Sequence, residues 1–336
     1  MTEPEPREGR GRWVLGAVVS LTALALAVWG VQPTRLAETL RAARLGFLPL
    51  ILLLQLTGIA ARARAWQTLL GEVPYRRAFA ALNEGYLLNS LLPVRLGELV
   101  RAYLVQKGAA FGTAQALGSV VVERVLDVTI ALGALVLTLP ALAAPAWARE
   151  MATAVGVALA VVVIGLGALV LSRRSGPALM ARLPGVLGRV LPRLVQGLTS
   201  GVHAAGSFPR LLPGAAWLLA GWVAAWAQFE LYLRTYGATG SPNVWLFALS
   251  VIAFGAAVPS SPGAIGVFEL AGSAGLRALG YPAEVALSVA VTAHLMQIAV
   301  TGILGSWFLS REGESVAHLA REATDLARRV AQPRSG

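Results

Sequence analysis

The sequence has no cysteine, few histidines and little charge, and each shortage excludes a class of protein. Because none of the 336 residues is cysteine, disulfide bonds, thiolate catalysis and cysteine-ligated metal sites are excluded. The three histidines, His203, His294 and His318, are widely separated, so we expect no metal centre. Charged residues make up 13% of the chain, about half the share of a typical soluble protein. This is too little charge to cover a surface that faces water.

Long apolar runs account for the missing charge. A helix needs about 20 predominantly apolar residues to cross the hydrocarbon core of a bilayer. Six runs predict full crossings, at about 13–31, 46–66, 118–140, 151–172, 211–233 and 285–309. We therefore predict an all-α polytopic membrane protein with a transmembrane domain at 13–310.

The basic residues fall mainly on one side of these crossings. With the N-terminus in the cytoplasm, 21 of the 28 lysine and arginine residues lie on the cytoplasmic side and five lie outside, as the positive-inside rule requires. The net charge of +11 is therefore better explained by membrane topology than by nucleic acid binding. This topology predicts a cytoplasmic tail at 1–12, cytoplasmic amphipathic segments at 173–210 and 311–336, and both termini in the cytoplasm.

Two further apolar regions, about 78–107 and 244–279, are interrupted by proline and glycine. The first is broken at Pro93 and the second at Pro262-Gly263, and such residues interrupt the hydrogen-bond ladder of a helix. Each region therefore predicts a re-entrant hairpin. The topology puts the two hairpins on opposite sides of the membrane, which is typical of a transporter built as an inverted repeat. Ordinary kinks in transmembrane helices are the alternative.

Ionisable residues near the first break are candidate functional residues, because charge inside a membrane is costly and usually functional. Arg95, Glu98 and Arg101 share one helix face. In the next crossing, Glu123 and Asp127 share a face, and we expect both to pair with arginines of the first break. The two arginines of the first break, Arg95 and Arg101, could bind a phosphate diester. An ion-pair lock between hairpin and helix, without a ligand, is the alternative.

The second break offers backbone groups as well as charge. Gly263 and Gly266 permit close approach of the backbone, and the helix that follows presents unsatisfied N–H groups to an anion. Glu269 lies one turn into that helix. His294, in the last crossing, could carry protons, although a lone histidine in an apolar helix more often only packs. Glu230 and Arg234, four residues apart, are expected to close their crossing as an ion pair.

These features define two predicted sets of residues. The substrate-binding set comprises Arg95, Glu98, Arg101, Glu123, Arg124, Asp127, Pro262, Gly263, Gly266 and Glu269. The set predicted to couple protons comprises Glu98, Asp127, Glu269 and His294. No catalytic residue, metal site or cofactor is predicted.

Three motifs in order resemble one family. P-x-R-x-G-E at 93–98, E-R-x-x-D at 123–127 and P-G-x-x-G-x-F-E at 262–269 are similar to the lysylphosphatidylglycerol synthase transmembrane family, also called flippase-like domain proteins. The resemblance covers about residues 10–312. It implies the fold of the membrane domain of the multiple peptide resistance factor. That domain is thought to move aminoacylated phosphatidylglycerol between leaflets. Because 26 residues follow the last apolar run, we expect no transferase domain and no enzyme activity.

The sequence therefore predicts a translocase in the bacterial inner membrane that moves an anionic phospholipid or a polyprenyl-phosphate-linked lipid. An intramembrane enzyme, such as a polyprenyl-pyrophosphate phosphatase, is one alternative, but Ala264, Ile265 and Gly266 stand where its nucleophile is expected. A nontransporting scaffold that recruits a partner through 311–336 is the other.

Overall fold

The computed structural model describes residues 8–71, 73–92, 96–107, 109–142, 145–171, 199–205, 207–258, 260–313 and Leu319. Within these residues the chain consists of helices and the loops that connect them, which confirms the predicted all-α class. Several predictions lie outside the described residues. They are Arg95, residues 173–198 of the amphipathic segment, the tail after Gly313 apart from Leu319, and residues 1–7 of the N-terminal tail.

Six long helices occupy the predicted crossings. They are α1 (Glu8–Val28), α3 (Leu48–Leu70), α6 (Thr113–Thr138), α7 (Ala146–Leu171), α10 (Phe208–Thr235) and α13 (Ala283–Glu312). Each begins and ends within about five residues of its predicted bounds. Among the described residues, α3, α7, α10 and α13 have the length and apolar composition to span a membrane. The chain is therefore a multi-pass membrane protein.

Helix α6 is as long as the spanning helices but differs in composition. Its 26 residues carry Glu123, Arg124 and Asp127 at their midpoint. The sequence predicts these residues one or two turns inside the crossing, but α6 begins at Thr113 and so places them about three to four turns from its start. Three ionisable side chains at the middle of a long apolar helix require partners within the protein.

The two predicted hairpins are present as pairs of short helices. The first comprises α4 (Tyr75–Leu91) and α5 (Gly97–Gln106), and the second comprises α11 (Pro242–Gly255), the short 3₁₀ helix η3 (Pro262–Ala264) and α12 (Val267–Ala278). Each of these helices has 17 residues or fewer, which is less than a full crossing needs.

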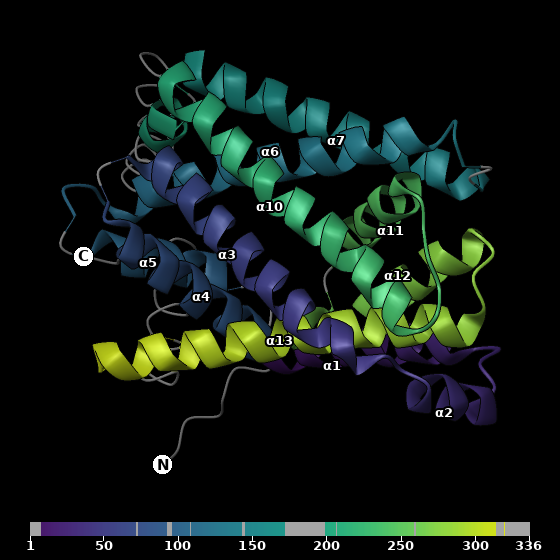
Figure 1. Cartoon of the computed structure of the whole chain (residues 1–336). Helices are drawn as coiled ribbons and strands as arrows, with labels where there is room; N and C mark the ends of the chain where they lie inside the picture. The colour runs from purple at the N-terminus through teal and green to yellow at the C-terminus, as the bar shows by residue number, and fades with distance from the viewer. Residues whose placement is uncertain are drawn as a thin grey trace.

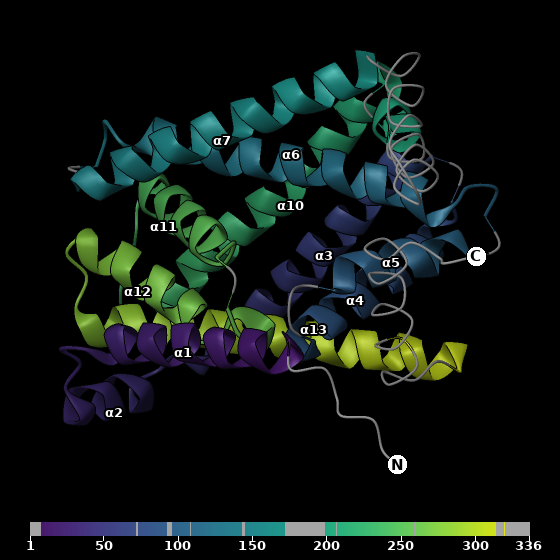
Figure 2. The ribbon, with the colours of Figure 1, turned by 180° about the vertical axis from the view of Figure 1, so that it is seen from behind.

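The two hairpins lie at opposite ends of the molecule. Figures 1 and 2 show α4 and α5 at the end where α13 finishes, and α11 and α12 at the end where α13 begins. Close packing fixes one helix of each pair, α4 and α12, on α13. A Cβ on Gly305 would lie 2.6 Å from the Cβ of Leu87 in α4, and a Cβ on Gly272 would lie 2.9 Å from the Cβ of Ala290. This opposed placement agrees with the predicted inverted arrangement of the hairpins.

A short helix that the sequence analysis does not predict, α2 (Pro33–Arg41), follows α1. The chain turns by 82° between the two helices. Side chains from distant segments hold this turn, because Glu284 accepts a hydrogen bond from the backbone N–H of Gln32 and Arg277 donates one to the carbonyl of Trp29. The charge distribution places the basic residues of this region in a loop outside the membrane, whereas Arg35 and Arg41 lie on α2.

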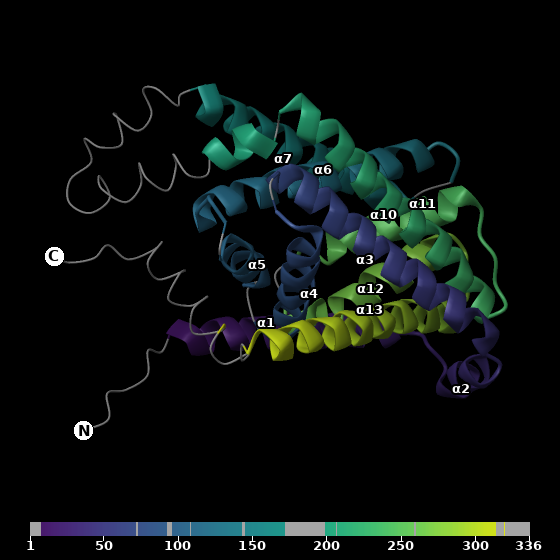
Figure 3. The ribbon, with the colours of Figure 1, turned by 60° about the vertical axis from the view of Figure 1, so that its left-hand side comes forward.

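Helices α3 and α10 run side by side through the whole molecule (Figure 3). Glycines allow this contact, since a Cβ on Gly221 would lie 3.4 Å from the carbonyl oxygen of Gly58. Small residues at such contacts let two membrane helices approach closely. The pair contributes to the buried apolar clusters around both hairpins: Trp66 of α3 packs with residues of α4 and α5, and Phe229 of α10 packs with residues of α11 and α12.

Candidate functional site

A network of ion pairs joins the first hairpin to the long helices beside it. We call it the ion-pair cluster; its described members are Arg62, Glu98, Arg101, Glu123, Arg124 and Asp127. At its centre, the guanidinium of Arg101 lies 2.6 Å from Glu98 and 2.9 Å from Glu123. Its side chain is 1% exposed and stacks 4.7 Å from the ring centroid of Trp66. This geometry attaches α5 to α6.

Asp127 forms the second part of the ion-pair cluster. Its Oδ2 accepts a hydrogen bond from Arg62 of α3 at 2.8 Å, and its Oδ1 accepts one from the indole of Trp222 in α10 at 3.0 Å. Each carboxylate oxygen therefore has a donor from a different helix. The arrangement ties α3, α6 and α10 together at one depth and compensates the cost of burying the carboxylate.

Arg124 connects the two parts and is the most exposed arginine of the ion-pair cluster. Its guanidinium lies 3.1 Å from Glu123, 3.2 Å from Asp127 and 3.6 Å from Glu98. Its side chain is 41% exposed, against 1% for Arg101 and 23% for Arg62. Helix geometry places Arg124 about 100° from Glu123 and on the same face as Asp127, and its long side chain reaches both. It is therefore the arginine best placed to meet a molecule from outside the bundle.

The charges of the ion-pair cluster balance among its described members. Three arginines face three carboxylates. Removing a buried member such as Glu123 leaves Arg101 without part of its compensation, which costs about 3–5 kcal/mol. An anion that binds Arg124 must either compete with these carboxylates or arrive together with a proton.

The backbone of the second break adopts conformations that favour glycine. Gly263 has φ 71° and Gly266 has φ 87°, both in the left-handed region. Gly266 also packs against α1, where a Cβ would collide with the carbonyl oxygen of Ser20. The N–H of Gly266 donates to Oε2 of Glu269 at 2.7 Å, so Glu269 caps the first turn of its own helix.

His294 of α13 links the second break to α12. Its Nδ1 lies 2.6 Å from Oε1 of Glu269, and its Nε2 lies 2.8 Å from the carbonyl oxygen of Gly263. The ring of Phe268 stacks on the imidazole with centroids 4.2 Å apart. Helix geometry suggests Gln297 as the neighbour of His294, but the hydrogen-bond partners of its ring come from the second hairpin.

The second break packs against the last turn of α4, in the first hairpin. A Cβ on Gly263 would lie 3.7 Å from the carbonyl oxygen of Ser90, near the end of α4. One turn earlier on α4, Tyr86 lies near Arg62 and Glu123. Helix α4 therefore runs from the ion-pair cluster to the second break, and the two predicted sets of residues adjoin one path through the molecule.

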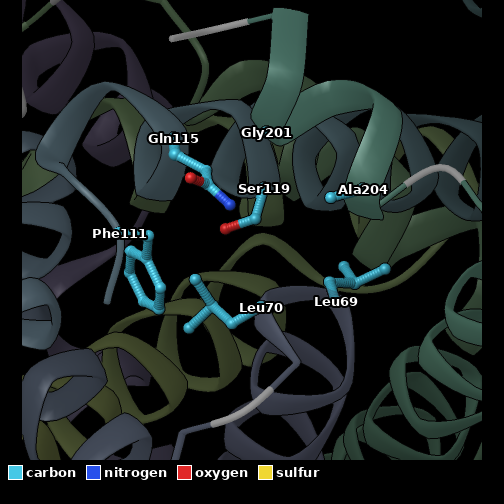
Figure 4. A pocket seen from close by; sticks show the side chains of 7 residues that line it. All are labelled: Leu69, Leu70, Phe111, Gln115, Ser119, Gly201 and Ala204. Atoms are coloured by element: carbon cyan, nitrogen blue, oxygen red, sulfur yellow. The ribbon is translucent and has the colours of Figure 1, made fainter. Parts of the chain in front are cut away.

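A small pocket lies one turn of α6 away from the ion-pair cluster. Figure 4 shows Gln115 and Ser119 of α6 opposite Leu70 and Phe111. The pocket offers about 10 Å³ to a water-sized molecule, which is room for about one water. The hydroxyl of Ser119 accepts a hydrogen bond from the indole of Trp66, so the pocket adjoins the packing beneath Arg101. It is too small for a lipid headgroup.

Comparison with known proteins identifies the family. A family model described as "Lysylphosphatidylglycerol synthase TM region" matches residues 13–305. The chain belongs to this family. A curated relative, named "Glycosyltransferase AglD", from Haloferax volcanii, is 26% identical over 334 aligned positions. The match covers 87% of this chain and 53% of the relative, so the chain spans about half the length of that relative. No solved structure matches the sequence.

The family motifs fall on the two sets of contacts described above. Glu123, Arg124 and Asp127 of the second motif are members of the ion-pair cluster, and Glu98 of the first motif reaches them through Arg101. The third motif forms the second break, in which Pro262 begins η3. The predicted pairing of Arg101 with Glu123 is confirmed, whereas the acid Asp127 pairs with Arg62 and Arg124.

Two other sequence predictions can be compared with the contacts. The ion pair between Glu230 and Arg234 is confirmed at 2.6 Å. Glu230 also accepts hydrogen bonds from the N–H of Gly240 and the indole of Trp245, so it shapes the loop after α10. These contacts give Glu230 a structural role at the end of that crossing.

Sequence reasoning misses three partners of the site: Arg62, Trp66 and Trp222. Arg62 is counted with the cytoplasmic loop residues, although it falls within the predicted crossing at 46–66. Its place inside an apolar run is the signal that could have found it. The tryptophans resemble ordinary apolar residues of a spanning helix, and their contacts with charged groups become evident only when the helices are packed.

Proposed function

We propose that this protein moves an anionic lipid headgroup between the leaflets of the bacterial cytoplasmic membrane. The observation that carries the proposal is the meeting of two broken hairpins, which enter from opposite ends and bring Gly263 beside Ser90. Nonhelical backbone at membrane depth is tolerated where protein or a water-filled cavity surrounds it. In transporters, interrupted helices of opposite orientation flank the substrate path.

The ion-pair cluster supplies the charge that a headgroup phosphate needs. Arg124 is its most exposed arginine and touches three carboxylates, so a phosphate can replace carboxylate contacts without leaving the guanidinium unpaired. Arg62 lies beside it through their shared contact with Asp127. Arg101 is enclosed by Glu98, Glu123 and Trp66, and we assign it the role of holding α5 against α6.

The family and the charge pattern support the remaining parts of the proposal. The family is named for a lipid synthase, which favours a phospholipid or a polyprenyl-phosphate-linked lipid as the cargo. The distribution of basic residues favours a cytoplasmic position for both termini. We propose that transport uses an ion gradient or a lipid imbalance, and that the protein does not itself change the lipid chemically.

The name of the Haloferax relative raises glycosyl transfer as the rival activity. At the second break of this chain, Glu269 and His294 hydrogen-bond to each other and to the backbone. The nearby hydroxyl of Ser261 lies close to backbone carbonyls instead of a basic side chain. These contacts favour a role in conformation over one in nucleophilic attack.

Lipid translocation in liposomes tests the proposal. The purified protein is reconstituted into vesicles that carry a fluorescent-headgroup phosphatidylglycerol in both leaflets, and a quencher that cannot cross the membrane is added outside. We expect quenching to exceed the outer-leaflet share seen in protein-free vesicles. Chromatography of the extracted lipid distinguishes movement from chemistry, because a transferase or phosphatase would alter the headgroup.

A matched pair of variants locates the activity. Arg124→Gln removes the exposed arginine of the ion-pair cluster, while Arg234→Gln removes an arginine of similar exposure at the end of α10. We expect Arg124→Gln to abolish translocation and Arg234→Gln to retain it. Quenching that stops at the outer-leaflet share for the native protein, with anionic lipids and an imposed pH gradient, would overturn the proposed function.

A further inference from the structure

The two hydrogen-bond partners of the His294 ring require more N–H donors than a neutral imidazole has. Its Nδ1 faces a carboxylate oxygen of Glu269 at 2.6 Å, and its Nε2 faces the carbonyl oxygen of Gly263 at 2.8 Å. A backbone carbonyl and an ionised carboxylate can only accept hydrogen bonds, and a neutral imidazole has a single N–H. With Glu269 ionised, one of these two contacts would bring two acceptors together.

One additional proton satisfies both contacts. Either His294 is an imidazolium that donates to Glu269 and Gly263, or a neutral His294 donates from Nε2 to Gly263 while a protonated Glu269 donates to Nδ1. Both forms contain the same number of hydrogens, and in both the pair has no net charge. We propose that Glu269 and His294 form a binding site for one proton, and that this proton holds the second break closed.

The surroundings of the pair favour the form without net charge. His294 is 3% exposed and Glu269 is 8% exposed, so a net charge on the pair would be poorly solvated. Other neighbouring elements bring uncharged groups: the hydroxyl of Ser20 from α1 bonds to the break itself, and Ser90 lies at the end of α4. Helix α10 brings Tyr236, whose hydroxyl bonds to Thr292. Glu269 is the charged residue in contact with His294.

Loss of the proton changes the backbone contact first. The single remaining hydrogen stays between Nδ1 and Glu269, because a hydrogen bond to a carboxylate is stronger than one to a neutral carbonyl. The lone pair of Nε2 then faces the carbonyl oxygen of Gly263, and the two atoms repel. The proton itself passes to water, and the pair acquires a net charge of one negative unit.

The break is a segment that such a repulsion can release. Gly263 has φ 71° and Ala264, which is not glycine, has φ 56°. A nonglycine residue in the left-handed region costs about 1–2 kcal/mol and persists where contacts hold it. Because Gly263 packs beside Ser90, release of Gly263 loosens the contact between the second break and α4 of the first hairpin. If the proposed function is correct, this site couples translocation to protons.

Thiol accessibility tests the site without any transport assay. The protein has no cysteine, so one introduced residue is its only thiol. Val267→Cys places it in the buried first residue of α12, and Ile265→Cys places a control thiol at a position that is 51% exposed. The labelling rate of Val267→Cys is divided by the labelling rate of Ile265→Cys. This ratio removes the intrinsic pH dependence of thiol reactivity.

For the otherwise native protein, we expect this ratio to rise about tenfold or more between about pH 5.5 and about pH 8.5, as the linkage of opening to one proton predicts. Glu269→Gln is the informative variant, because a glutamine can accept from Gly266 and donate to Nδ1 of a neutral His294. The break then stays closed without the extra proton, and the ratio stays low at every pH. His294→Phe keeps the ring but loses both contacts, so the ratio stays high at every pH.

A spectroscopic measurement tests the proton count directly. The variant His203→Gln, His318→Gln leaves His294 as the single histidine, so the nitrogen NMR signals of labelled histidine report that ring alone. We expect hydrogen on Nε2 at low pH and its loss as the labelling ratio rises. A bare Nε2 in the closed protein, or a labelling ratio that does not change with pH, would overturn the proton site. Absence of lipid movement would instead overturn the proposed function.

Discussion

The two breaks handle buried charge in different ways. At the first, three arginines and three carboxylates compensate one another through ion pairs that join α3, α5 and α6. At the second, one carboxylate and one imidazole depend on a single proton, and their hydrogen bonds reach the backbone of the break. Removal of a buried charge such as Glu123 from the ion-pair cluster is costly, whereas the Glu269–His294 pair changes its bonding when one proton leaves.

This difference assigns a separate task to each break. Fixed ion pairs hold their helices together over a wide range of pH because arginine keeps its proton. A histidine can gain or lose a proton within the physiological range. We infer that the ion-pair cluster provides a rigid site with one exposed arginine, and that the second break provides the part that moves. Four substitutions test this comparison.

Glu123→Gln has the largest expected effect. It removes a fully buried carboxylate from Arg101, and we expect a loss of about 3–5 kcal/mol in the free energy of unfolding, measured in detergent by thermal or denaturant unfolding. The double variant Arg101→Met, Glu123→Leu removes the pair together and should recover most of the loss. A single-variant loss below about 1 kcal/mol would show that the ion-pair cluster is not a structural lock.

Gly266→Ala tests the close packing of α1 on the second break. Its Cβ would collide with the carbonyl oxygen of Ser20, and φ at this position is 87°. The control is Gly280→Ala, where φ is 88° and no atom lies within 4 Å of the new Cβ. In both variants the left-handed backbone conformation lowers the free energy of unfolding by about 1–2 kcal/mol. We expect Gly266→Ala to cost more than its control in unfolding, and equal costs would contradict the proposed contact with α1.

Glu269→Gln sharpens the comparison with Glu123→Gln, since the chemical change is identical. Glutamine can keep both hydrogen bonds at position 269, so we expect a loss below about 1 kcal/mol in the free energy of unfolding at neutral pH. The native Glu269–His294 pair contributes to the free energy of unfolding at low pH, and this contribution falls as the proton leaves. The free energy of unfolding of the variant should therefore depend less on pH than that of the native protein. An equal loss for the two glutamine variants would remove the distinction between the breaks.

Arg124→Gln has the smallest expected effect on stability. Its side chain is 41% exposed, and exposed ion pairs contribute about 0–1 kcal/mol. We therefore expect the unfolding free energy to change little while lipid movement is lost. If Arg124→Gln instead destabilises the protein as strongly as Glu123→Gln, Arg124 is a structural member of the ion-pair cluster and not a contact for a headgroup.

The long helices and both hairpins could be predicted because their signals are local. Apolar length gives the six long helices, and the breaks at Pro93 and Pro262 separate short helices. Helix α2 was missed because its nine residues are too short and too polar to resemble a crossing. Distant residues hold the turn that precedes it.

The candidate site was predicted in part, for a related reason. Motif spacing places Glu98, Arg101 and Glu123 near one another, and their ion pairs are present. The contact of His294 with Glu269 joins residues 25 positions apart on different helices, and no helical period reports it. The role of Arg62 depends in the same way on how α3 packs against α6.

The most direct test of the proposed function compares two fluorescent lipids in vesicles that contain the native protein. One probe has an anionic phosphatidylglycerol headgroup and the other a zwitterionic phosphatidylcholine headgroup. Because Arg124 is proposed to meet a net negative headgroup, we predict that the anionic probe reaches the quencher from both leaflets and that Arg124→Gln abolishes this movement. Equal movement of both probes, unchanged in Arg124→Gln, would contradict the proposed site. No movement of either probe would contradict translocation itself.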